Sequence, residues 1–515
     1  MTNTDIVQKL WNLCDVLRDD GINYSDYVSE LTLLLFIKME YEQVRNNPDF
    51  EHKLPPSARW PKLSGHTETS VLEEYSDILR VLGDHSDPVI SAIYSGAETR
   101  IREPKHLVQL IKSFDTIDWF SAKKDGLGDL YEGLLEKNAS ETKSGAGQYF
   151  TTRPLIDSII RCMQPQAGET IQDPAAGTAG FLIAAHLYIK KATDSFNKLS
   201  LSERDFQRRK AFIGVELVPS TRRLALMNCL LHGMDGGKDG VVLLGNALGD
   251  AGAKLPKVNI VFSNPPFGNA KGGAASISRS FTHKTSNKQL VFLQHIYHSL
   301  SPGGRAAVVL PDNVLFEAGA GAEVRRELME LCNLHTILRL PTGIFYAQGV
   351  KTNVLFFQKG SIDNPKQTKG CTERLWVYDL RTNMPSFGKR RPFEAEHLMP
   401  FERAYGNDPN GRGARMESIA SDGDYSRFKC FSRSEIAERG DSLDIKWITD
   451  VEAAEVDTLD EPEVLAAQAM AEITEALREL ESLMSSLGAD DEVAMQRQIL
   501  ADAMGLELNK GGENG

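Results

Sequence analysis

The sequence predicts an α/β protein in which an N-terminal helical domain precedes a doubly wound, mostly parallel sheet and a helical C-terminal tail. Two patterns carry this prediction. Near the start, apolar residues such as Ile6, Leu10, Leu13 and Leu17 recur at three- and four-residue steps, which is the period of a helix with one buried face. Beyond Gly145, short β-rich runs alternate with helical stretches, as in parallel sheets covered by helices.

The helical pattern extends over residues 1–140, which we expect to form one domain. Residues 27–44 form a second long periodic segment, and core packing is the simplest role for its apolar stripe. Gly145 and Gly147 then interrupt the pattern, because glycine is unfavourable inside helices.

Seven β-rich runs define the sheet expected within residues 141–385. They are 170–173, 212–216, 241–244, 258–262, 306–310, 336–340 and 353–357. Doubly wound sheets bind ligands beyond the carboxyl ends of their strands. The residues that directly follow each run are therefore the candidate site.

The last part of the chain divides into two segments. Residues 386–455 are rich in proline and glycine, and we expect a loop-rich connecting region. Residues 456–515 are expected to form a helical tail, because apolar side chains at alternating steps of three and four form an a/d heptad seam. These are Met470, Ile473, Leu477, Leu480, Met484 and Leu487. The seam is too short to be stable alone, so the helix either packs on its own chain or joins a helix of a partner.

Bulk composition limits the classes of function. A chain of 515 residues with 41% hydrophobic and 25% charged residues suits several soluble domains. The apolar run 31–37 is too short to cross a bilayer, and no signal segment precedes it. Six single cysteines without a CxxC pair predict reduced thiols in the cytoplasm and no metal site. The net charge of −13 means that if the chain acts on nucleic acid, another component supplies much of the binding energy.

The first strand ends in the turn 173-DPAAGTAGF-181, which opens a helix. Its small residues let the backbone approach a ligand, and the helix N-terminus can receive a negative group. The turn lacks the GK[ST] of a Walker loop and the G-x-G-x-x-G of a dinucleotide site. A plain strand-to-helix turn is the alternative.

Two further strand ends carry candidate ligand-binding side chains. Glu216 ends the second run, where doubly wound folds place an acid against ribose hydroxyls, and a carboxylate accepts two such hydrogen bonds. Asn246 lies in 245-GNAL-248 after the third run and is able to hydrogen-bond an adenine ring. A surface glutamate and a turn-forming asparagine are the respective alternatives.

The fourth strand ends in 264-NPPF-267. The amide oxygen of Asn264 and the carbonyl of Pro265 are two acceptors, which suit an exocyclic NH2 group with two hydrogens to donate. Phe267 offers a face on which a planar base can stack. Pro265 and Pro266 have fixed φ angles, which hold the acceptors in place before reaction.

The order of these motifs resembles that of the amino-group DNA adenine methyltransferases, which use S-adenosylmethionine. The motifs are 147-GQYFTTRPLI-156, 173-DPAAGTAGF-181, Glu216, 245-GNAL-248 and 264-NPPF-267. More narrowly, 131-YEGLLEKNASETKSGAGQYFTTRPLI-156 and 340-LPTGIFYAQGVKTNVLFF-357 are similar to the modification subunits (HsdM) of type I restriction-modification systems. The resemblance covers nearly the whole chain and implies that residues 141–385 form a methyltransferase domain.

The resemblance also implies which residues bind S-adenosylmethionine. The implied set is Gln148, Tyr149, Phe150, Thr151, Thr152, Arg153, Asp173, Gly177, Thr178, Ala179, Gly180, Glu216 and Asn246. Two positions depart from the family pattern, because Ala179 replaces a more frequent glycine and Thr152 a frequent proline. Alanine is small, so we still expect the cofactor to bind.

The implied reaction is a direct methyl displacement at adenine N6, with Asn264, Pro265, Pro266 and Phe267 as the catalytic residues. Acceptors on both amino hydrogens would favour a pyramidal nitrogen whose lone pair faces the methyl group. The adenine must leave the duplex, so base flipping is implied, with Phe267 stacking on it. Phe345 or Tyr346 would flank the other face, although core packing suits either residue.

A basic loop follows the catalytic motif. Residues 268–289 contain Lys271, Arg279, Lys284 and Lys288 and no acid, and we expect these side chains to bind DNA phosphates. A solvated loop is the alternative.

The resemblance implies partners as well as double-stranded DNA. Two modification subunits would join one specificity subunit, HsdS, which reads the sequence, and the motor-nuclease subunit HsdR would complete the restriction enzyme. The terminal heptad would dock on HsdS. Methylation of RNA or of protein glutamine, or a non-catalytic assembly role, are the competing functions, and no membrane partner is expected.

Overall fold

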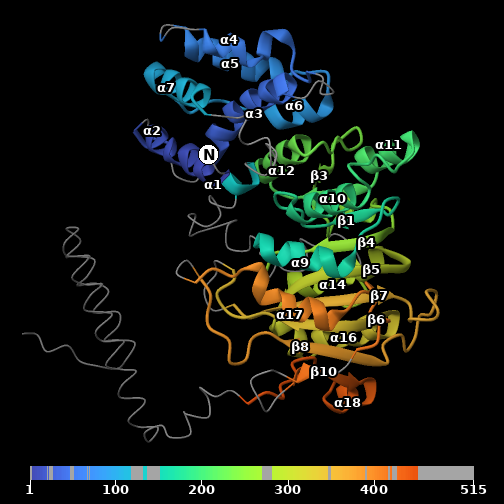
Figure 1. Cartoon of the computed structure of the whole chain (residues 1–515). Helices are drawn as coiled ribbons and strands as arrows, with labels where there is room; N and C mark the ends of the chain where they lie inside the picture. Colours follow the sequence, from blue (N-terminus) through green and yellow to red (C-terminus); the bar gives the residue numbers. More distant parts are fainter. Residues whose placement is uncertain are drawn as a thin grey trace, which may run out of the picture. The chain divides into compact units, whose positions relative to one another are not determined.

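The computed structural model describes thirteen stretches of the chain (Figure 1). They are residues 3–19, 21–22, 27–46, 52–65, 68, 70–117, 131–135, 151–268, 281–345, 350–388, 391–415, 418–419 and 426–449. Residues 1–448 form one compact unit, and residues 449–515 form a second one. The predicted heptad helix lies outside the described residues.

Helices dominate the first part of the chain, as predicted. They are α1 (Asn3–Asn12), α2 (Cys14–Asp19), α3 (Tyr27–Asn46), the short 3-10 helix η2 (Pro56–Ala58), α4 (Trp60–Ser64), α5 (Val71–Gly83), α6 (Pro88–Tyr94) and α7 (Pro104–Asp115). Local sequence signals mark the first residues of some of these helices. Asp87 accepts from the backbone N–H groups of Val89 and Ile90, with Pro88 as the first helical residue, which is a favourable N-terminus. None of the helices among the described residues is long and apolar enough to cross a membrane.

The remaining chain builds one twisted sheet, which runs down Figure 1 in the order β3-β2-β1-β4-β5-β7-β6-β8-β10-β9. The strands are β1 (Ile171–Asp173), β2 (Phe212–Glu216), β3 (Val242–Leu244), β4 (Val258–Ser263), β5 (Leu300–Pro311), β6 (Cys332–Arg339), β7 (Thr352–Lys359), β8 (Arg374–Asp379), β9 (Ser418–Ile419) and β10 (Ser426–Ser432). The strands β1 to β5 pair in parallel, and β6 pairs in parallel with β8. All seven predicted runs are strands, and the mostly parallel α/β fold is confirmed.

Helices cover both faces of this sheet. The helices of this part are α9 (Arg153–Met163), α10 (Gly180–Ala192), α11 (Leu201–Arg209), α12 (Pro219–Leu231), α13 (Asp250–Ala253), α14 (Lys288–Ser299), α15 (Asn313–Phe316), α16 (Ala320–Leu331), α17 (Ala395–Tyr405) and α18 (Arg433–Glu438). Phe262 and Phe356 belong to the core with α9, α10 and α17, whereas Val261 and Phe357 belong to the core with α14 and α16. Alternate strand residues therefore point to opposite faces, each of which is buried.

The region 386–455 is more regular than the loop-rich connection that we expected. It contains α17 and β10, and β10 pairs antiparallel with β8 and so extends the sheet. Two features hide these elements in the sequence. Pro400 lies inside α17, where proline normally breaks a helix, and β10 has only seven residues, SRFKCFS, with few aliphatic side chains.

Candidate cofactor and target-base site

The parallel strands β1, β2 and β4 end at one edge of the sheet, and their last residues carry most of the predicted site. Asp173 ends β1, Glu216 ends β2, and Asn264 directly follows β4. Hydrogen bonds connect these ends to one another and to the turn that opens α10. The structure therefore brings together residues that lie up to 91 positions apart in the sequence.

Asp173 joins β1 to β4 and is only 2% exposed. Its Oδ1 accepts from the Ser263 hydroxyl at 2.9 Å and from the Ala175 N–H at 3.0 Å. Burial raises the pKa of Asp173 to about 7, and the nearby charge of Glu216 acts in the same direction. The carboxyl group is thus directed into the protein, where it holds the turn and the strand end that precedes the candidate catalytic motif.

Glu216 fixes the same turn from β2. Its two carboxylate oxygens accept from the backbone N–H of Gly177 at 3.0 Å and from that of Val218 at 2.8 Å. Burial is the main cause that raises its pKa. Each carboxylate oxygen has a second lone pair, so the group retains the capacity to accept from ligand hydroxyls.

The turn between β1 and α10 depends on left-handed backbone conformations at Gly177, with φ +54°, and at Ala179, with φ +68°. A Cβ atom at Gly177 would meet nothing within 4 Å, so this side of the turn is open. Ala179 is fully buried, which directs its methyl group into the protein and away from the open side. A positive φ explains why glycine suits position 179, and the burial explains how alanine leaves the ligand side clear.

The candidate catalytic motif, residues 264–267, is held by its first residue. The Asn264 Nδ2 donates to the Thr151 hydroxyl at 3.0 Å, which leaves the role of acceptor to the amide oxygen. Asn264 and Phe267 are partly exposed, Pro265 is buried and Pro266 is exposed. An aromatic side chain is thus accessible directly after β4, whereas the amide oxygen of Asn264 is itself buried.

Other predicted residues have different positions. Arg153 begins α9 and donates to Asp157 at 2.9 Å and to Glu132, so its guanidinium is engaged by carboxylates. The Asn246 Oδ1 accepts from the Leu248 N–H at 2.9 Å, which is the turn-forming role. Phe345 is 3% exposed and belongs to the core.

The remaining predicted positions are two lysines of the basic loop, Thr152, and six residues outside the described ranges. Lys284 is exposed and Lys288 partly exposed. Thr152 precedes α9 with φ −63°, the angle that proline imposes, which explains the frequency of proline there. The positions outside the described residues are Gln148, Tyr149, Phe150, Lys271, Arg279 and Tyr346.

Sequence reasoning missed three residues of this region, namely Leu217, Asn228 and Glu132. Leu217, which follows Glu216, is 64% exposed. Asn228 in α12 donates to the Thr178 carbonyl at 3.1 Å, and its side chain lies 3.5 Å from a carboxylate oxygen of Glu132. The signal for Asn228 was a polar amide inside the apolar stretch 224-LALMNCLL-231, because buried amides require partners.

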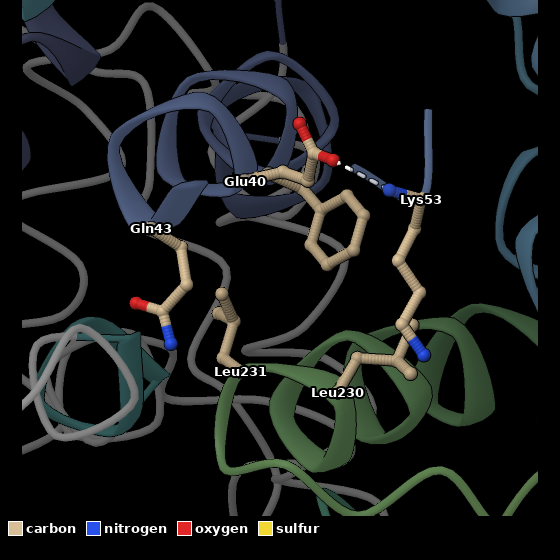
Figure 2. A pocket seen from close by; sticks show the side chains of 6 residues that line it. Glu40, Gln43, Lys53, Leu230 and Leu231 are labelled. Atoms are coloured by element: carbon tan, nitrogen blue, oxygen red, sulfur yellow. Dashed lines mark hydrogen bonds between the residues drawn. The ribbon is translucent and has the colours of Figure 1, made fainter. Parts of the chain in front are cut away.

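A small pocket also lies where α3 meets α12 (Figure 2). Its lining residues are Phe36, Glu40, Gln43, Lys53, Leu230 and Leu231. The Glu40 carboxylate accepts from the Lys53 N–H at 2.8 Å, and the Lys53 ammonium donates to Asp235 at 2.8 Å. Because these charged groups bind one another or Asp235, the pocket is a structural junction between the helical domain and the sheet domain.

Comparison with known proteins decides the family. Three family models match successive parts of the chain: the HsdM N-terminal domain at residues 6–114, N-6 DNA Methylase at 122–457, and the C-terminal domain of the type I restriction enzyme methylase subunit at 459–502. The chain is 53% identical to the EcoKI methylase subunit of Escherichia coli K12, over 98% of this chain and 99% of that protein. The chain belongs to the methylase subunits of type I restriction enzymes.

Other relatives agree with this assignment. The StySPI methylase subunit of Salmonella potsdam is 52% identical over 98% of this chain and 99% of its own length. The crystal structure of the EcoKI M protein is 49% identical, with a TM-score of 0.58, and the match covers 97% of this chain and 99% of that one. The methylase subunit is therefore an adenine-specific DNA methyltransferase that depends on S-adenosylmethionine, as predicted. Among the described residues, no group of three or more His, Cys, Asp or Glu side chains is arranged to hold a metal ion.

Proposed function

We propose that this methylase subunit transfers a methyl group to N6 of adenine in double-stranded DNA, within a complex whose sequence specificity belongs to HsdS. The observation that carries the proposal is the position of Asn264. The strand end that holds it also holds Ser263, which is bonded to Asp173, and Asp173 bonds the turn at Ala175. The residue for the target base and the turn for the cofactor are thereby fixed to each other.

The residues at this edge fit S-adenosylmethionine. Glu216 offers carboxylate acceptors for ribose hydroxyls, and the open side of Gly177 allows a ligand to approach the turn. The exposed Leu217 offers an apolar face to the adenine ring of the cofactor. We propose that Thr151, Thr152, Thr178, Gly180 and Asn246 complete the pocket, together with 148–150. Asp173, Ala179 and Arg153 would act from behind it, since their side chains are engaged within the protein.

Bound S-adenosylmethionine would supply an electrophilic methyl group. The protein contributes position and electrostatics. The Asn264 amide oxygen and the Pro265 carbonyl would accept the two hydrogens of the adenine amino group, which directs the nitrogen lone pair out of the ring plane. Phe267 would stack on an adenine that has been flipped out of the duplex. The proton that N6 loses would pass to solvent.

The partners follow from the family. The relatives are named as subunits of type I restriction enzymes, and we propose that two copies of this chain assemble with one HsdS and with HsdR. The basic residues of 268–289 would contact DNA phosphates near the flipped base. The match to the N-6 DNA Methylase family favours DNA over RNA or protein glutamine as the substrate.

Asn264→Ala tests the proposed catalytic role. The variant and the wild type would be co-expressed with HsdS and assayed by radioactive methyl transfer to DNA, RNA and protein. We expect at least a 100-fold loss of DNA methylation, because one preorganised polar group at a reacting centre contributes about 10²–10³-fold, while S-adenosylmethionine binding by calorimetry is retained.

Asn259→Ala is a matched control, since Asn259 lies near the other end of β4 and its amide oxygen accepts from Thr170 at 2.9 Å. We expect its DNA methylation to stay near the wild-type rate. Equal rates for Asn264→Ala and wild type would contradict the catalytic role. Methylation of RNA or protein alone would contradict the DNA substrate, and a wild type that binds no S-adenosylmethionine would indicate a non-catalytic assembly role.

A further inference from the structure

A buried asparagine outside the predicted site touches the turn between β1 and α10, residues 174–179, which we call the cofactor turn. Asn228 lies in α12 and is 1% exposed. Its neighbours Leu226, Met227 and Cys229 are also buried. A buried amide without partners costs about 1–3 kcal/mol. The groups that Asn228 contacts therefore indicate its role.

The first contact of Asn228 is with the turn. Its Nδ2 donates to the Thr178 carbonyl at 3.1 Å. Thr178 lies between Gly177 and Ala179, the two residues with left-handed backbone. A hydrogen bond to the carbonyl between them restrains the turn at its tightest point.

The second contact leads to the start of α9. The Asn228 Nδ2 lies 3.5 Å from one carboxylate oxygen of Glu132, and the other carboxylate oxygen accepts from the Arg153 guanidinium. Arg153 follows Thr151 by two residues, and Thr151 accepts from Asn264. A chain of polar contacts therefore runs from the turn through Asn228 and Glu132 to Arg153, which the backbone connects to Thr151, the hydrogen-bond partner of Asn264.

The segment that carries Glu132 is itself firmly placed. Tyr131 and Leu134 are fully buried, and Leu135 is 3% exposed. The Tyr131 hydroxyl contacts the Leu224 carbonyl at 3.5 Å and the Met227 sulfur at 3.4 Å, both on α12. Glu132 thus occupies a fixed position between α12 and α9.

We propose that Asn228 and Glu132 are positioning residues, which hold the 177–180 turn and the start of α9 in the arrangement that binds S-adenosylmethionine next to Asn264. The inference rests on the proposed function, because it assigns the cofactor to this turn. Neither residue touches the reacting atoms. Their effect on the reaction passes through Thr178 and Arg153.

Asn228→Asp and Glu132→Gln test the proposal. Asn228→Asp keeps the shape but faces the Thr178 carbonyl and Glu132 with a carboxylate, and we expect at least a tenfold weaker S-adenosylmethionine affinity by calorimetry. In the assembled enzyme, the KM for S-adenosylmethionine should rise about as much, with an unchanged KM for DNA. Glu132→Gln removes only the charge that pairs with Arg153, so we expect about a threefold weaker affinity.

The double variant separates the two contacts. Asn228→Asp with Glu132→Gln removes the repulsion between the two carboxylates, and its affinity should recover part of the loss seen in Asn228→Asp alone. Such non-additivity is the sign of a direct interaction. Strictly multiplicative losses would overturn the link between Asn228 and Glu132.

Asn287→Asp provides the matched control for affinity. Asn287 is also a buried asparagine whose Nδ2 donates to a glutamate, Glu317, at 2.7 Å. Within the described part of the chain, its hydrogen bonds reach neither the turn nor α9. We expect its S-adenosylmethionine affinity to stay within twofold of wild type, even though the new carboxylate beside Glu317 lowers the Tm.

The outcomes are distinguishable. A folded Asn228→Asp variant with wild-type affinity would overturn the proposal. If that variant does not fold, Glu132→Gln with unchanged affinity would overturn it instead, since the Glu132 side chain is partly exposed and tolerates an amide. A wild type that binds no S-adenosylmethionine would refute the proposed function itself.

Discussion

At Ala179, backbone strain and burial of the methyl group have opposite effects on the stability of the protein. Its φ of +68° costs an L-residue about 1–2 kcal/mol. Its buried methyl group contributes about 0.8 kcal/mol, and alanine reduces the freedom of the unfolded chain by about 0.4–1 kcal/mol relative to glycine. The cost of strain and these two stabilising contributions nearly cancel, so alanine and glycine should give similar stability at position 179.

We therefore predict that Ala179→Gly changes the free energy of unfolding by less than about 1 kcal/mol, from this balance of strain and burial. Ala179→Val should lower it by more than about 2 kcal/mol, because a β-branched side chain at positive φ adds strain and overpacking. Urea denaturation of the three proteins measures both values. A valine variant as stable as wild type would contradict the strained conformation.

Asp173 gives the stability of the protein a specific pH dependence. Its pKa is raised from the ordinary value of 3.8 to about 7 by burial. Between these two pH values the folded protein holds a proton that the unfolded chain has released, so its contribution to stability falls as the pH rises. Above pH 7 both states are ionised and the contribution becomes constant.

Asp173→Asn isolates this effect, because the amide cannot ionise and its oxygen can still accept from Ser263 and Ala175. We predict that the stability of the variant relative to wild type increases from pH 5 to pH 8. Denaturant titrations of both proteins across this interval measure the difference. A difference that is constant with pH would show that the Asp173 pKa is close to its ordinary value.

At the scale of elements, the described end of the basic segment 268–289 bears on its proposed contact with DNA. Its end is anchored, since Asn287 caps α14 by accepting from Gln289 at 3.0 Å and His283 donates its N–H to Gln294 at 3.0 Å. Lys284 is exposed between these anchors. A fixed base with exposed cations suits the binding of a phosphate backbone.

We predict that replacing Lys271, Arg279, Lys284 and Lys288 by glutamate weakens DNA binding of the assembled enzyme and flattens its salt dependence. Each lost phosphate contact should lower the slope of log K against log salt by about 0.9. The control reverses the four lysines Lys190, Lys191, Lys198 and Lys210, which lie between the end of α10 and the start of β2, at the opposite edge of the sheet. Equal slopes for both variants would refute the role of the loop.

The elements that the sequence predicted well have strong local signals. The seven runs became strands β1–β7, and most of them are parallel strands buried on both faces, which favours apolar stretches. Strand β7 is antiparallel to both neighbours but is likewise buried. The later elements β8, β10 and α17 were not predicted, because their pairing partners and packing surfaces come from distant segments. For example, Trp376 and Phe428 lie on different strands and stack at 4.7 Å.

The candidate site divides in the same way. Asp173, Glu216 and Asn264 were identifiable, because each ends a predicted strand and parallel strands end at one edge. Asn228 and Glu132 were not, because their roles depend on α12 and the segment 131–135 meeting in space. Arg153 was assigned to the cofactor from its motif alone, whereas its guanidinium contacts Glu132 and Asp157.

At the scale of the whole molecule, the chain consists of a compact unit of residues 1–448 and a separate unit of residues 449–515. The second unit contains the match to the C-terminal domain of type I methylase subunits at 459–502 and the predicted heptad seam. This family match and the predicted seam are the reasons for the proposal that the segment binds another subunit. Its removal should therefore affect assembly and leave the cofactor site intact.

We predict that truncation after Asp457 abolishes co-purification with HsdS and retains S-adenosylmethionine binding. Leu477→Asp combined with Leu480→Asp should have the same effect, because a charged group at a seam position prevents helix pairing. Ser482→Asp with Ser485→Asp is the control, since these positions lie outside the seam. An assembled complex that contains the truncated chain would disprove the docking role.

Helix α12 has a consequence for any attempt to isolate the catalytic part. Its residues Ala225, Leu226 and Met227 belong to the same hydrophobic core as α3 and α6, and Asn228 of the same helix contacts the cofactor turn. A fragment that began at residue 141 would leave that apolar surface facing water, next to the turn. We therefore expect that the methyltransferase domain is not active without the N-terminal helices, and that the smallest active form includes them.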